Sequence, residues 1–359
     1  MNVLHIASGD LWAGAEVQIC TLLKALISSG AKVSVIIFNE GRLADELVQA
    51  GANVIVISES QNGIFSLIKK VKIQLARLRP NIVHTHRQKE HIVGSIANML
   101  TSKQPCVRTV HGSPEFSLSF KQRVQSKIDR FCGRNLQHAL ISVDEELTEK
   151  LSTNFRRKHI YTIPNGIDVQ DTLFRAETTK INVDDSYKHI GIVGRLEPVK
   201  RVDLFLDMAK LIVDSNDEEA RYHFHVFGGG NLEAALKHQS HQLNLDETVT
   251  FHGHTNAIQS WIKAMDVVVM TSDHEGLPMT SLECLTLGTP LVAHAVGGLV
   301  PLLTTAFPQG LVTEHSPHAY AKTTQFIAKA QPLVELPQRY TASRNAQQVL
   351  NLYQTLLKD

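Results

Sequence analysis

Residues 274–293 read HEGLPMTSLECLTLGTPLVA and carry the clearest structural signal in the chain. Pro278 suits the first turn of a helix, and Gly288 suits the position just after the last turn. We therefore predict a short helix that begins near Met279 and stops at Gly288, followed by a buried apolar strand at 291–295. A turn, a helix and a strand in this order are a fragment of an α/β sheet.

Two glutamates eight positions apart flank the start of this helix. Glu275 lies in the turn before it and Glu283 about one turn inside it, so free backbone N–H groups lie between the two carboxylates. This arrangement suits a sugar diphosphate, with a phosphate at the helix N-terminus and the carboxylates on hydroxyls. A solvated Glu near a helix start, with a capping partner further in, explains the spacing equally well.

The alternation of strand and helix extends through the first half of the chain. Apolar runs that predict strands lie near residues 2–8, 32–38, 53–58, 81–86, 106–111, 138–143 and 160–163. Segments with helical periodicity, such as 16–28, 65–79 and 119–135, separate them. Because repeated strand and helix units give parallel strands, this half predicts one parallel sheet covered by helices.

The same rhythm restarts in the second half. Strands are predicted at 190–193, 223–227, 249–252, 267–271 and 291–295, and helices at 202–213, 232–243, 257–265 and 279–287. Between the halves, residues 168–188 mix Asp, Thr, Glu and Lys without an apolar period, which predicts a linker or long loop. A last amphipathic helix at 345–358 can pack on either half. The fold class is therefore α/β, with two doubly wound halves.

Length and composition agree with two domains. The chain has 359 residues, and a single core usually stops growing at about 250–300 residues. Its four cysteines lack paired spacing, which predicts buried thiols and neither a disulfide framework nor a zinc site. The first residues lack the basic and apolar regions of a signal peptide, and Gly and Pro interrupt the longest uncharged stretch, 284–313. We expect a cytoplasmic protein without a transmembrane segment.

Charge is distributed unevenly along the chain. Residues 1–165 carry 21 Lys and Arg against 13 Asp and Glu, whereas residues 166–359 carry 15 against 22. The basic residues of the first half gather in two helix-like stretches, 69–79 and 120–134. These stretches are solvated helix faces, or they contact anionic lipid or a polyanionic acceptor and place the protein peripherally at the inner face of a membrane. Nucleic acid fits poorly, because overall charge is balanced and the sequence has no aromatic-rich basic strand.

Three glycine-rich loops follow predicted strands, at the carboxyl ends where open α/β sheets bind ligands. In the first, residues 8–16, small residues around Gly14 let a phosphate approach backbone N–H groups. The second holds Arg195 and Lys200 just past a strand, where cations suit a diphosphate or pair with neighbouring acids. The third, Gly228-Gly229-Gly230, is either a close backbone approach or a loose turn.

Histidines in two of the predicted strands are candidate functional residues. His84 and His86 point to the same face of one strand, so metal binding is one reading of the pair. Hydrogen-bonded strand histidines in a cleft are favoured over it, because Glu90 is the only nearby acid and no Cys completes a ligand set. His111 ends another strand, before Gly112, at the rim where a catalytic or substrate-positioning group lies. A structural histidine is the alternative there.

Together these motifs resemble the retaining GT-B glycosyltransferases, in particular family 4. The motifs that carry the resemblance, in chain order, are Ala13-Gly14-Ala15-Glu16, VHTH at 83–86, TVHG at 109–112, IPNGID at 163–168, Gly194-Arg195-Leu196 with Lys200, and Glu-x7-Glu from Glu275 to Glu283. Single pieces are common, but the ordered set covers nearly the whole chain and is specific.

The resemblance implies a GT-B architecture, with two Rossmann-like domains facing a cleft and a C-terminal helix crossing back to the N-terminal domain. Residues 1–166 with the terminal helix 340–359 would bind the acceptor, and residues 167–339 the nucleotide sugar. The implied activity transfers a sugar, most often from a UDP-sugar, to a hydroxyl of a glycan or lipid-linked saccharide with retention of anomeric configuration. Surface polysaccharide or lipopolysaccharide biosynthesis is the implied setting, without a metal or cofactor.

The resemblance also assigns roles to residues of this chain. The implied donor-binding residues are Gly14, Arg195, Lys200, Gly276, Leu277, Pro278, Met279 and Glu283, and the implied catalytic residues are His111 and Glu275. Glu283 would hold the ribose hydroxyls, and Arg195 and Lys200 the diphosphate. Glu275 would bind the donor sugar, His111 would contact that sugar beside the reacting carbon, and the base would lie near residues 251–254.

One position departs from the family pattern. Many relatives carry an acidic residue shortly after a double glycine, whereas this chain reads GGLVP at 297–301, so a carboxylate contact there is in doubt. Two alternatives stay open: a nucleotide-sugar epimerase or phosphorylase of the same architecture, and a non-catalytic nucleotide-sugar-binding subunit. A phosphorylase would use a lysine-bound pyridoxal phosphate, which no feature of the sequence supports.

Overall fold

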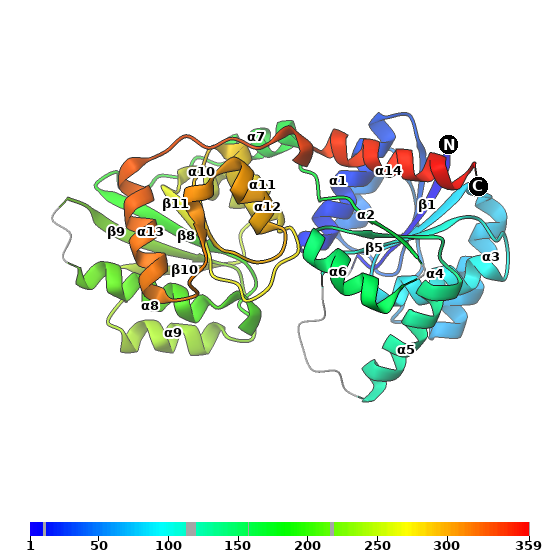
Figure 1. Ribbon diagram of the computed structural model, residues 1–359, viewed down its shortest axis with the longest axis horizontal. Helices are drawn as coiled ribbons and strands as arrows, with labels where there is room; N and C mark the ends of the chain where they lie inside the picture. The colour runs from blue at the N-terminus through cyan, green and yellow to red at the C-terminus, as the bar shows by residue number, and fades with distance from the viewer. Residues whose placement is uncertain (10–11, 113–119, 157, 216–218, 359) are drawn as a thin grey trace. The chain divides into compact units, whose positions relative to one another are not determined.

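The chain folds into two compact units. The computed structural model describes residues 1–9, 12–112, 120–156, 158–215 and 219–358, with the side chains of residues 120 and 121 left out. Unit 1 comprises Met1–Ile167 and Arg339–Asp359, and unit 2 comprises Asp168–Gln338 (Figure 1). Each unit is built on its own parallel sheet with helices on both faces, so the two doubly wound halves predicted from the sequence are confirmed.

Unit 1 holds a seven-stranded parallel sheet in the order β3-β2-β1-β4-β5-β6-β7. Its strands are β1 (Asn2–Ala7), β2 (Lys32–Ile37), β3 (Asn53–Val56), β4 (Ile82–Thr85), β5 (Cys106–Val110), β6 (Ala139–Ser142) and β7 (His159–Thr162). Its helices are α1 (Gly14–Ser28), α2 (Arg42–Gln49), α3 (Ile64–Leu78), α4 (Gln88–Met99), α5 (Phe120–Asn135), α6 (Glu145–Asn154) and α14 (Ala342–Leu356). The strand order reverses between β1 and β4, which is where such sheets bind ligands.

Two hydrophobic layers sandwich this sheet. On one face, Leu23 of α1 and Val349 and Tyr353 of α14 pack in one buried cluster with β1 and β2. On the other face, α3 and α4 contribute a second cluster, in which Leu67 and Val71 follow the helical repeat. Helix α14 therefore supplies part of the core of unit 1, although the whole of unit 2 precedes it in the chain.

Buried polar contacts fix α5 and α14 onto unit 1. Arg108 of β5 is 1% exposed, and its Nη2 lies 2.7 Å from Oδ1 of Asp129 on α5. Where the chain returns, the N–H of Ile167 donates to the carbonyl of Tyr340 at 2.9 Å, and the N–H of Ala342 donates to Ile167 at 2.8 Å. These bonds hold the two connecting segments side by side at the end of unit 1.

Unit 2 holds a six-stranded parallel sheet in the order β10-β9-β8-β11-β12-β13. Its strands are β8 (Tyr187–Val193), β9 (Arg221–Phe227), β10 (Val249–Gly253), β11 (Val267–Met270), β12 (Leu291–His294) and β13 (Leu311–Val312). Its helices are α7 (Val169–Glu177), α8 (Val202–Asp214), α9 (Glu233–Gln242), α10 (Ile258–Ala264), α11 (Met279–Leu287), α12 (Leu299–Ala306) and α13 (Pro317–Ala330). The order reverses between β8 and β11, so the ligand position is the carboxyl end of those two strands.

The prediction of a loop at 168–188 was wrong for its first half, because α7 occupies 169–177. This helix buries only Thr172 and Ala176, so it lacks the apolar stripe that a sequence search detects. The side chain of Asp168 caps it by accepting from the N–H of Asp171 at 3.0 Å. A cap and short-range pairs therefore specify this helix.

None of the helices that the structure describes combines the length and the apolar content needed to cross a bilayer. The four cysteines, Cys20, Cys106, Cys132 and Cys284, are buried free thiols.

Candidate functional site

Three polar side chains, those of Lys200, Ser272 and Glu275, meet at the carboxyl ends of β8 and β11 in unit 2. Lys200, in the loop after β8, places Nζ 2.5 Å from Oε1 of Glu275. Ser272, two residues past β11, donates its hydroxyl to the same oxygen at 2.6 Å. The Glu275 side chain is 9% exposed, so its charge is paired in a place with little water.

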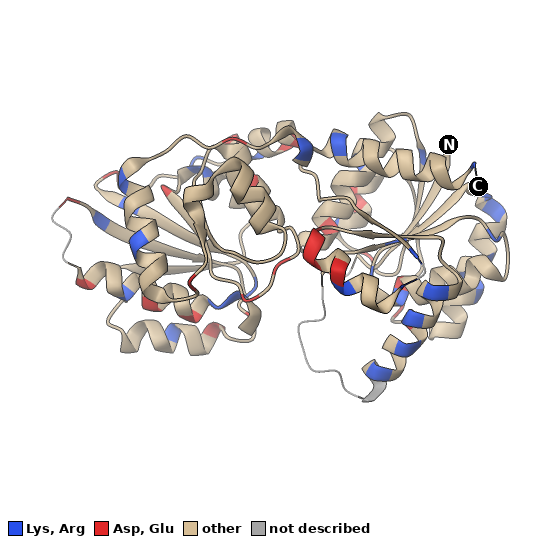
Figure 2. Cartoon of the chain, in the orientation of Figure 1, with Lys and Arg blue, Asp and Glu red and all other residues tan. Residues whose placement is uncertain are grey.

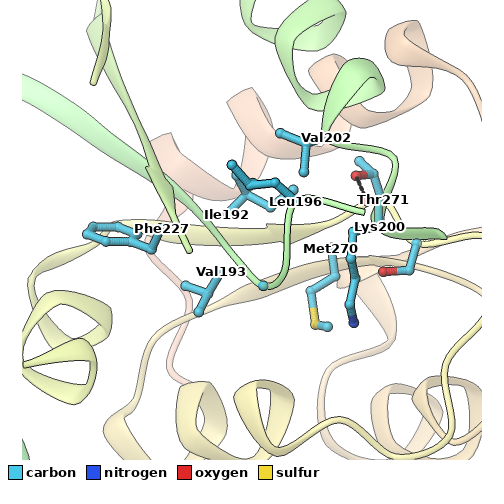
Figure 3. Close-up of a pocket in the computed structure, with 10 residues that line it drawn as sticks. Ile192, Val193, Leu196, Lys200, Val202, Phe227, Met270 and Thr271 are labelled. Carbon is cyan, nitrogen blue, oxygen red and sulfur yellow. Dashed lines mark hydrogen bonds between the residues drawn. The ribbon is translucent and has the colours of Figure 1, made fainter. Parts of the chain in front are cut away.

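A small pocket opens at this position, shown in Figure 3 with the Lys200 amino group beside Met270. Its lining includes Gly194, Lys200, Thr271 and Ser272. The hydroxyl of Thr271 donates to the carbonyl of Arg201 at 2.8 Å, which fastens the loop after β8 to the end of β11. The pocket therefore lies at the reversal of strand order, with a cation and a hydroxyl in its wall.

Glycines shape both loops of this site. Gly297 has φ of +50°, and a Cβ on it would lie 1.8 Å from the carbonyl oxygen of Glu275. Gly228 has φ of +121°, and a Cβ there would lie 1.9 Å from the carbonyl oxygen of Gly194. The double glycine at 297–298 thus supports the backbone of Glu275, and the triple glycine at 228–230 is a close backbone approach.

The N-terminus of α11 offers backbone groups to a ligand. Pro278 precedes the helix without a side-chain cap, and the side chains of Leu277 and Met279 are 3% and 6% exposed. These two residues belong to the core, and this end of the helix offers a ligand the positive end of the helix dipole. Arg195 is an exposed residue of the loop after β8.

Glu283 lies within α11, and its Oε1 accepts a hydrogen bond from the side-chain amide of Gln259 at 2.7 Å. Burial raises the pKa of this carboxyl, and the hydrogen bond from Gln259 opposes the rise. A carboxylate has several lone pairs, so Glu283 keeps acceptor sites for the paired hydroxyls of a ribose.

Residue His252 stands at the end of β10, in the segment predicted to meet the base. Its ring stacks on Phe227 at 4.5 Å and 11° between planes, and the Trp261 ring lies 4.5 Å away. Burial lowers the pKa of His252, so the ring is neutral at physiological pH. An aromatic floor of this kind suits a flat ring.

In unit 1, His111 follows the last residue of β5. Its Nε2 lies 3.3 Å from Nδ1 of His86, and burial, with a smaller effect from the charge of Arg87, lowers the pKa of His111 to about 4. Arg87 pairs with the buried carboxylate of Glu16 on α1 at 2.5 Å.

Gly14 begins α1 and is exposed. The predicted first loop also includes residues 10 and 11, which lie outside the described residues, as do residues 113 and 114 after His111.

A second pocket lies within unit 1. His111, Thr109, Asn165 and Asn345 give it polar groups, and aliphatic side chains such as Ile163 complete its wall. It therefore combines hydrogen-bonding groups with an apolar surface.

Among the described residues, His5, His84 and His86 form a cluster whose ring nitrogens lie close enough together to hold a metal ion. The His86 ring stacks on both His5 and His84, with 18° and 19° between planes. A metal bonds imidazole in the ring plane, and lone pairs of stacked rings run side by side instead of meeting at one point. The hydrogen-bonded reading of these strand histidines fits the geometry better.

Sequence reasoning did not single out Ser272, Gln259 or Tyr353. Ser272 could have been found, since it directly follows a buried strand at the sheet edge where ligands bind. Gln259 and Tyr353 carry no such signal, because each meets its partner only through tertiary packing.

Comparison with known proteins identifies the family. The model of the glycosyl transferases group 1 matches residues 174–348, and that of glycosyltransferase family 4 matches residues 12–171. The chain is 28% identical over 318 residues to the Escherichia coli UDP-Gal:alpha-D-GlcNAc-diphosphoundecaprenol alpha-1,3-galactosyltransferase, covering 83% of this chain and 80% of that protein.

Solved structures agree on the fold. HepE of Anabaena in complex with UDP and glucose superposes with a TM-score of 0.79 at 20% identity, over 99% of this chain and 100% of HepE. The lipopolysaccharide outer core galactosyltransferase WaaB superposes with a TM-score of 0.69 at 15% identity, over 99% of each chain. Because the two family models between them match residues 12–171 and 174–348, the chain belongs to the group 1 glycosyltransferases and is an enzyme that resembles family 4.

Proposed function

We propose that this glycosyltransferase moves a sugar from a UDP-sugar to a hydroxyl of a lipid-linked or glycan acceptor with retention of anomeric configuration, in the synthesis of a surface polysaccharide. The observation that carries the proposal is the group of Lys200, Glu275 and Ser272 at the carboxyl ends of β8 and β11. It offers a cation for a phosphate and a carboxylate for sugar hydroxyls within one hydrogen-bonded set.

Donor binding rearranges this set. A diphosphate competes with Glu275 for the ammonium group of Lys200, and the N-terminus of α11 adds backbone N–H groups for the distal phosphate. Once Lys200 turns to the phosphate, Glu275 is released to accept hydrogen bonds from the donor sugar. Arg195 adds a second cation to the diphosphate, and Glu283 holds the ribose.

The transfer step follows from the leaving group. Fixed positive charge on a departing UDP stabilises the transition state without a bound metal. Retention is consistent with attack of the acceptor hydroxyl on the same face, where the leaving phosphate oxygen takes the acceptor proton as the bond to the anomeric carbon breaks. In unit 1, we assign His111 to the reacting sugar and Gly14 to the phosphate.

The acceptor belongs to unit 1 in this proposal. The pocket beside His111 combines Asn165 and Asn345 with aliphatic side chains, which suits a hydroxyl on a partly apolar molecule. The Escherichia coli relative, by its name, acts on a saccharide linked to diphosphoundecaprenol, and an acceptor of that chemistry lies at a membrane.

Helix α5 supports contact with an anionic membrane. Val124, Ile128 and Phe131 are exposed and recur at the spacing of one helical face. Arg123, Lys127, Arg130 and Arg134 form an adjoining basic stripe, and Figure 2 shows the Lys and Arg positions along α5. An apolar stripe beside a basic one is typical of helices that lie in a lipid interface.

Donor binding and transfer are tested together. UDP-glucose, UDP-galactose and UDP-N-acetylglucosamine are screened by thermal shift, since a donor at 100 times its Kd adds about 2.7 kcal/mol of stability. Transfer from the donor that binds is then followed by UDP release with a polyprenyl diphosphate saccharide, and the anomeric configuration of the product is read by NMR.

Glu275→Gln separates an enzyme from a binding subunit. The variant keeps the shape of the side chain, so we expect donor binding to persist while UDP release falls at least about 100-fold. Equal rates in the wild-type protein and the variant would contradict the role of Glu275. Binding without turnover in the wild-type protein, across all three donors, would instead favour a non-catalytic subunit.

A further inference from the structure

A row of hydrogen bonds runs through unit 1 behind His111. His111 Nε2 meets Nδ1 of His86 at 3.3 Å, and Nε2 of His86 meets Nδ1 of His5 at 2.8 Å. Nε2 of His5 in turn lies 3.2 Å from the hydroxyl of Tyr353 on α14. The row therefore crosses from the end of β5 through β4 and β1 to a helix that the chain adds only after unit 2.

The row continues beyond the tyrosine. The Tyr353 hydroxyl also lies 2.5 Å from Nδ1 of His84, whose Nε2 lies 2.7 Å from the hydroxyl of Thr109. Burial is nearly complete along the row: at most 1% of each residue is exposed for His5, His84, His86 and Tyr353. Burial lowers the pKa of His5 to about 3 and the pKa values of His84 and His86 well below their usual range. Each ring is thus neutral near pH 7.

Neutral rings couple the links to one another. A neutral imidazole donates with one nitrogen and accepts with the other, so a ring that donates forward must accept from behind. The direction chosen at one link is consequently passed to every other link. Only two arrangements satisfy the row: His5, His86 and His111 all carry the proton on Nε2, or all carry it on Nδ1.

The two contacts of Tyr353 select between these arrangements. Hydrogen bonds donated by a hydroxyl are shorter than those donated by N–H, about 2.7–2.8 Å for O–H···O against about 2.9–3.0 Å for N–H···O. The 2.5 Å contact marks His84 as the acceptor of the tyrosine proton, and the 3.2 Å contact marks His5 as the donor to the phenol oxygen. The proton of His5 therefore lies on Nε2.

The consequence reaches the rim of the sheet. With Nε2–H on His5, His86 must donate through Nε2 and accept on Nδ1, and His111 must donate through Nε2. Nδ1 of His111 is then a bare lone pair. That atom is buried and has no hydrogen-bond partner among the described residues, and His111 lines the unit 1 pocket.

We propose that Tyr353, His5 and His86 are positioning residues that hold His111 in its Nε2–H tautomer, so that Nδ1 accepts a hydrogen bond from a hydroxyl bound in the pocket. The nature of that hydroxyl, on a sugar or on an acceptor, rests on the proposed function, but the row itself does not. Arg87 is the charged group that acts on His111, and its charge favours the neutral ring.

The ligand-free protein provides the first test. Long-range proton–nitrogen NMR of protein labelled with ¹⁵N-histidine distinguishes a protonated ring nitrogen from a bare one, and Asn substitutions of the individual histidines assign the signals. We expect His5, His84, His86 and His111 all to be Nε2–H. His189 is an internal reference, because its Nε2 faces the carbonyl of Asp184 at 2.9 Å and must carry the proton. A proton on Nδ1 of His111 in the wild-type protein would overturn the proposal.

Tyr353→Phe tests the control from α14. Loss of the hydroxyl removes the group that sets the direction, so the Nδ1 signal of His111 should move from the bare position toward an average of both tautomers. Tyr340→Phe is the matched control, because Tyr340 is also a buried tyrosine and its hydroxyl accepts a hydrogen bond from Arg339 instead of contacting a histidine. His111 should keep its signal in that variant. If Tyr353→Phe folds and leaves the His111 signal in place, Tyr353 has no positioning role. If Tyr353→Phe does not fold, the tautomers measured in the wild-type protein decide the proposal. Neither measurement requires substrate, so a negative result here can be told apart from a failure of the proposed function.

Discussion

Glu90 is a carboxyl that the fold keeps almost out of water. It lies in the first turn of α4 and is 1% exposed, and burial raises its pKa to about 7 from an ordinary value of 4.5. Between these two pH values the folded chain holds a proton that the unfolded chain has released. Stability contributed by the protonated form is therefore lost as the pH rises through that window.

Glu90→Gln should remove this loss, since the amide has the same shape and no proton to release. Relative to the wild-type protein, the variant should gain on the order of 3 kcal/mol of unfolding free energy between pH 4 and pH 8. Trp12 and Trp261 are the two tryptophans, so urea unfolding in a Trp261→Phe background reports unit 1 through Trp12. Parallel pH profiles for the two proteins would show that Glu90 is ionised in the folded state.

Two donor-site residues should discriminate between parts of the same ligand. Lys200→Ala should weaken UDP binding by about tenfold or more, because a charged hydrogen bond to phosphate is lost, and it should leave uridine binding unchanged. Glu283→Gln should weaken both ligands, because the ribose is common to them. Calorimetry with UDP and line-shape NMR with uridine measure the two effects. Uridine binding that falls with Lys200→Ala would place the lysine at the nucleoside instead.

Single residues of the candidate site were easier to predict from the sequence than the residues that contact them. Glu275 and Glu283 were readable because Pro278 and Gly288 mark a helix between two strands. The contact of Lys200 with Glu275 was not, since the residues are 75 positions apart and meet only where two strands end side by side. The same holds for Tyr353, whose partner His5 lies 348 positions away.

At the scale of elements, the segment that carries Glu275 depends on a glycine. Gly297→Ala should move this loop, because the new Cβ would overlap the carbonyl oxygen of Glu275 at 1.8 Å. We expect UDP affinity to fall at least about tenfold with a lower melting temperature. Gly288→Ala is the control: Gly288 also has positive φ, but nothing lies within 4 Å of its added Cβ, so it carries the backbone strain without the collision. Equal losses in the two variants would assign the effect to strain alone.

Helix α5 allows a second prediction at this scale. Phe131→Ser should reduce binding to vesicles that contain anionic lipid, because this side chain is 60% exposed on the stripe proposed to enter the interface. Phe326→Ser on α13 is matched in exposure, at 63%, and should leave vesicle binding unchanged. Sedimentation with phosphatidylglycerol vesicles compares them. Similar binding of both variants and the wild-type protein would exclude α5 as the contact.

Many elements with apolar patterns were predicted from the sequence, and others were missed. The strands at 32–37 and 106–110 are largely buried and were predicted, since most of their residues are apolar or β-branched. Strand β13 and helices α7, α12 and α13 were not predicted. Strand β13 is too short to show a pattern, and α7 buries few side chains. The order of the strands in the sheet could not be predicted either, because it depends on which side of β1 the fourth strand joins.

At the scale of the whole molecule, we expect unit 2 to fold without the last residues of the chain and unit 1 to require them. Unit 2 is continuous at 168–338, whereas unit 1 needs residues 339–359. A chain truncated after residue 338 loses Val349, Leu352 and Tyr353 from the core of unit 1, and burial of about 1.5–3 kcal/mol for each side chain is a large part of a domain's stability. Trp12 fluorescence should report an unfolded unit 1, and Trp261 a folded unit 2. A native Trp12 signal in the truncated chain would contradict this.

The late arrival of α14 sets an order for biosynthesis. A ribosome completes the whole of unit 2 before it makes the helix that fills the open side of unit 1. Domains generally fold as they emerge, yet here the first unit to emerge must wait for the second while its apolar face stays uncovered. Until Tyr353 has left the ribosome, the histidines at the middle of unit 1 also lack their phenol. The nascent chain therefore lacks a complete core in unit 1 until its last residues have been made.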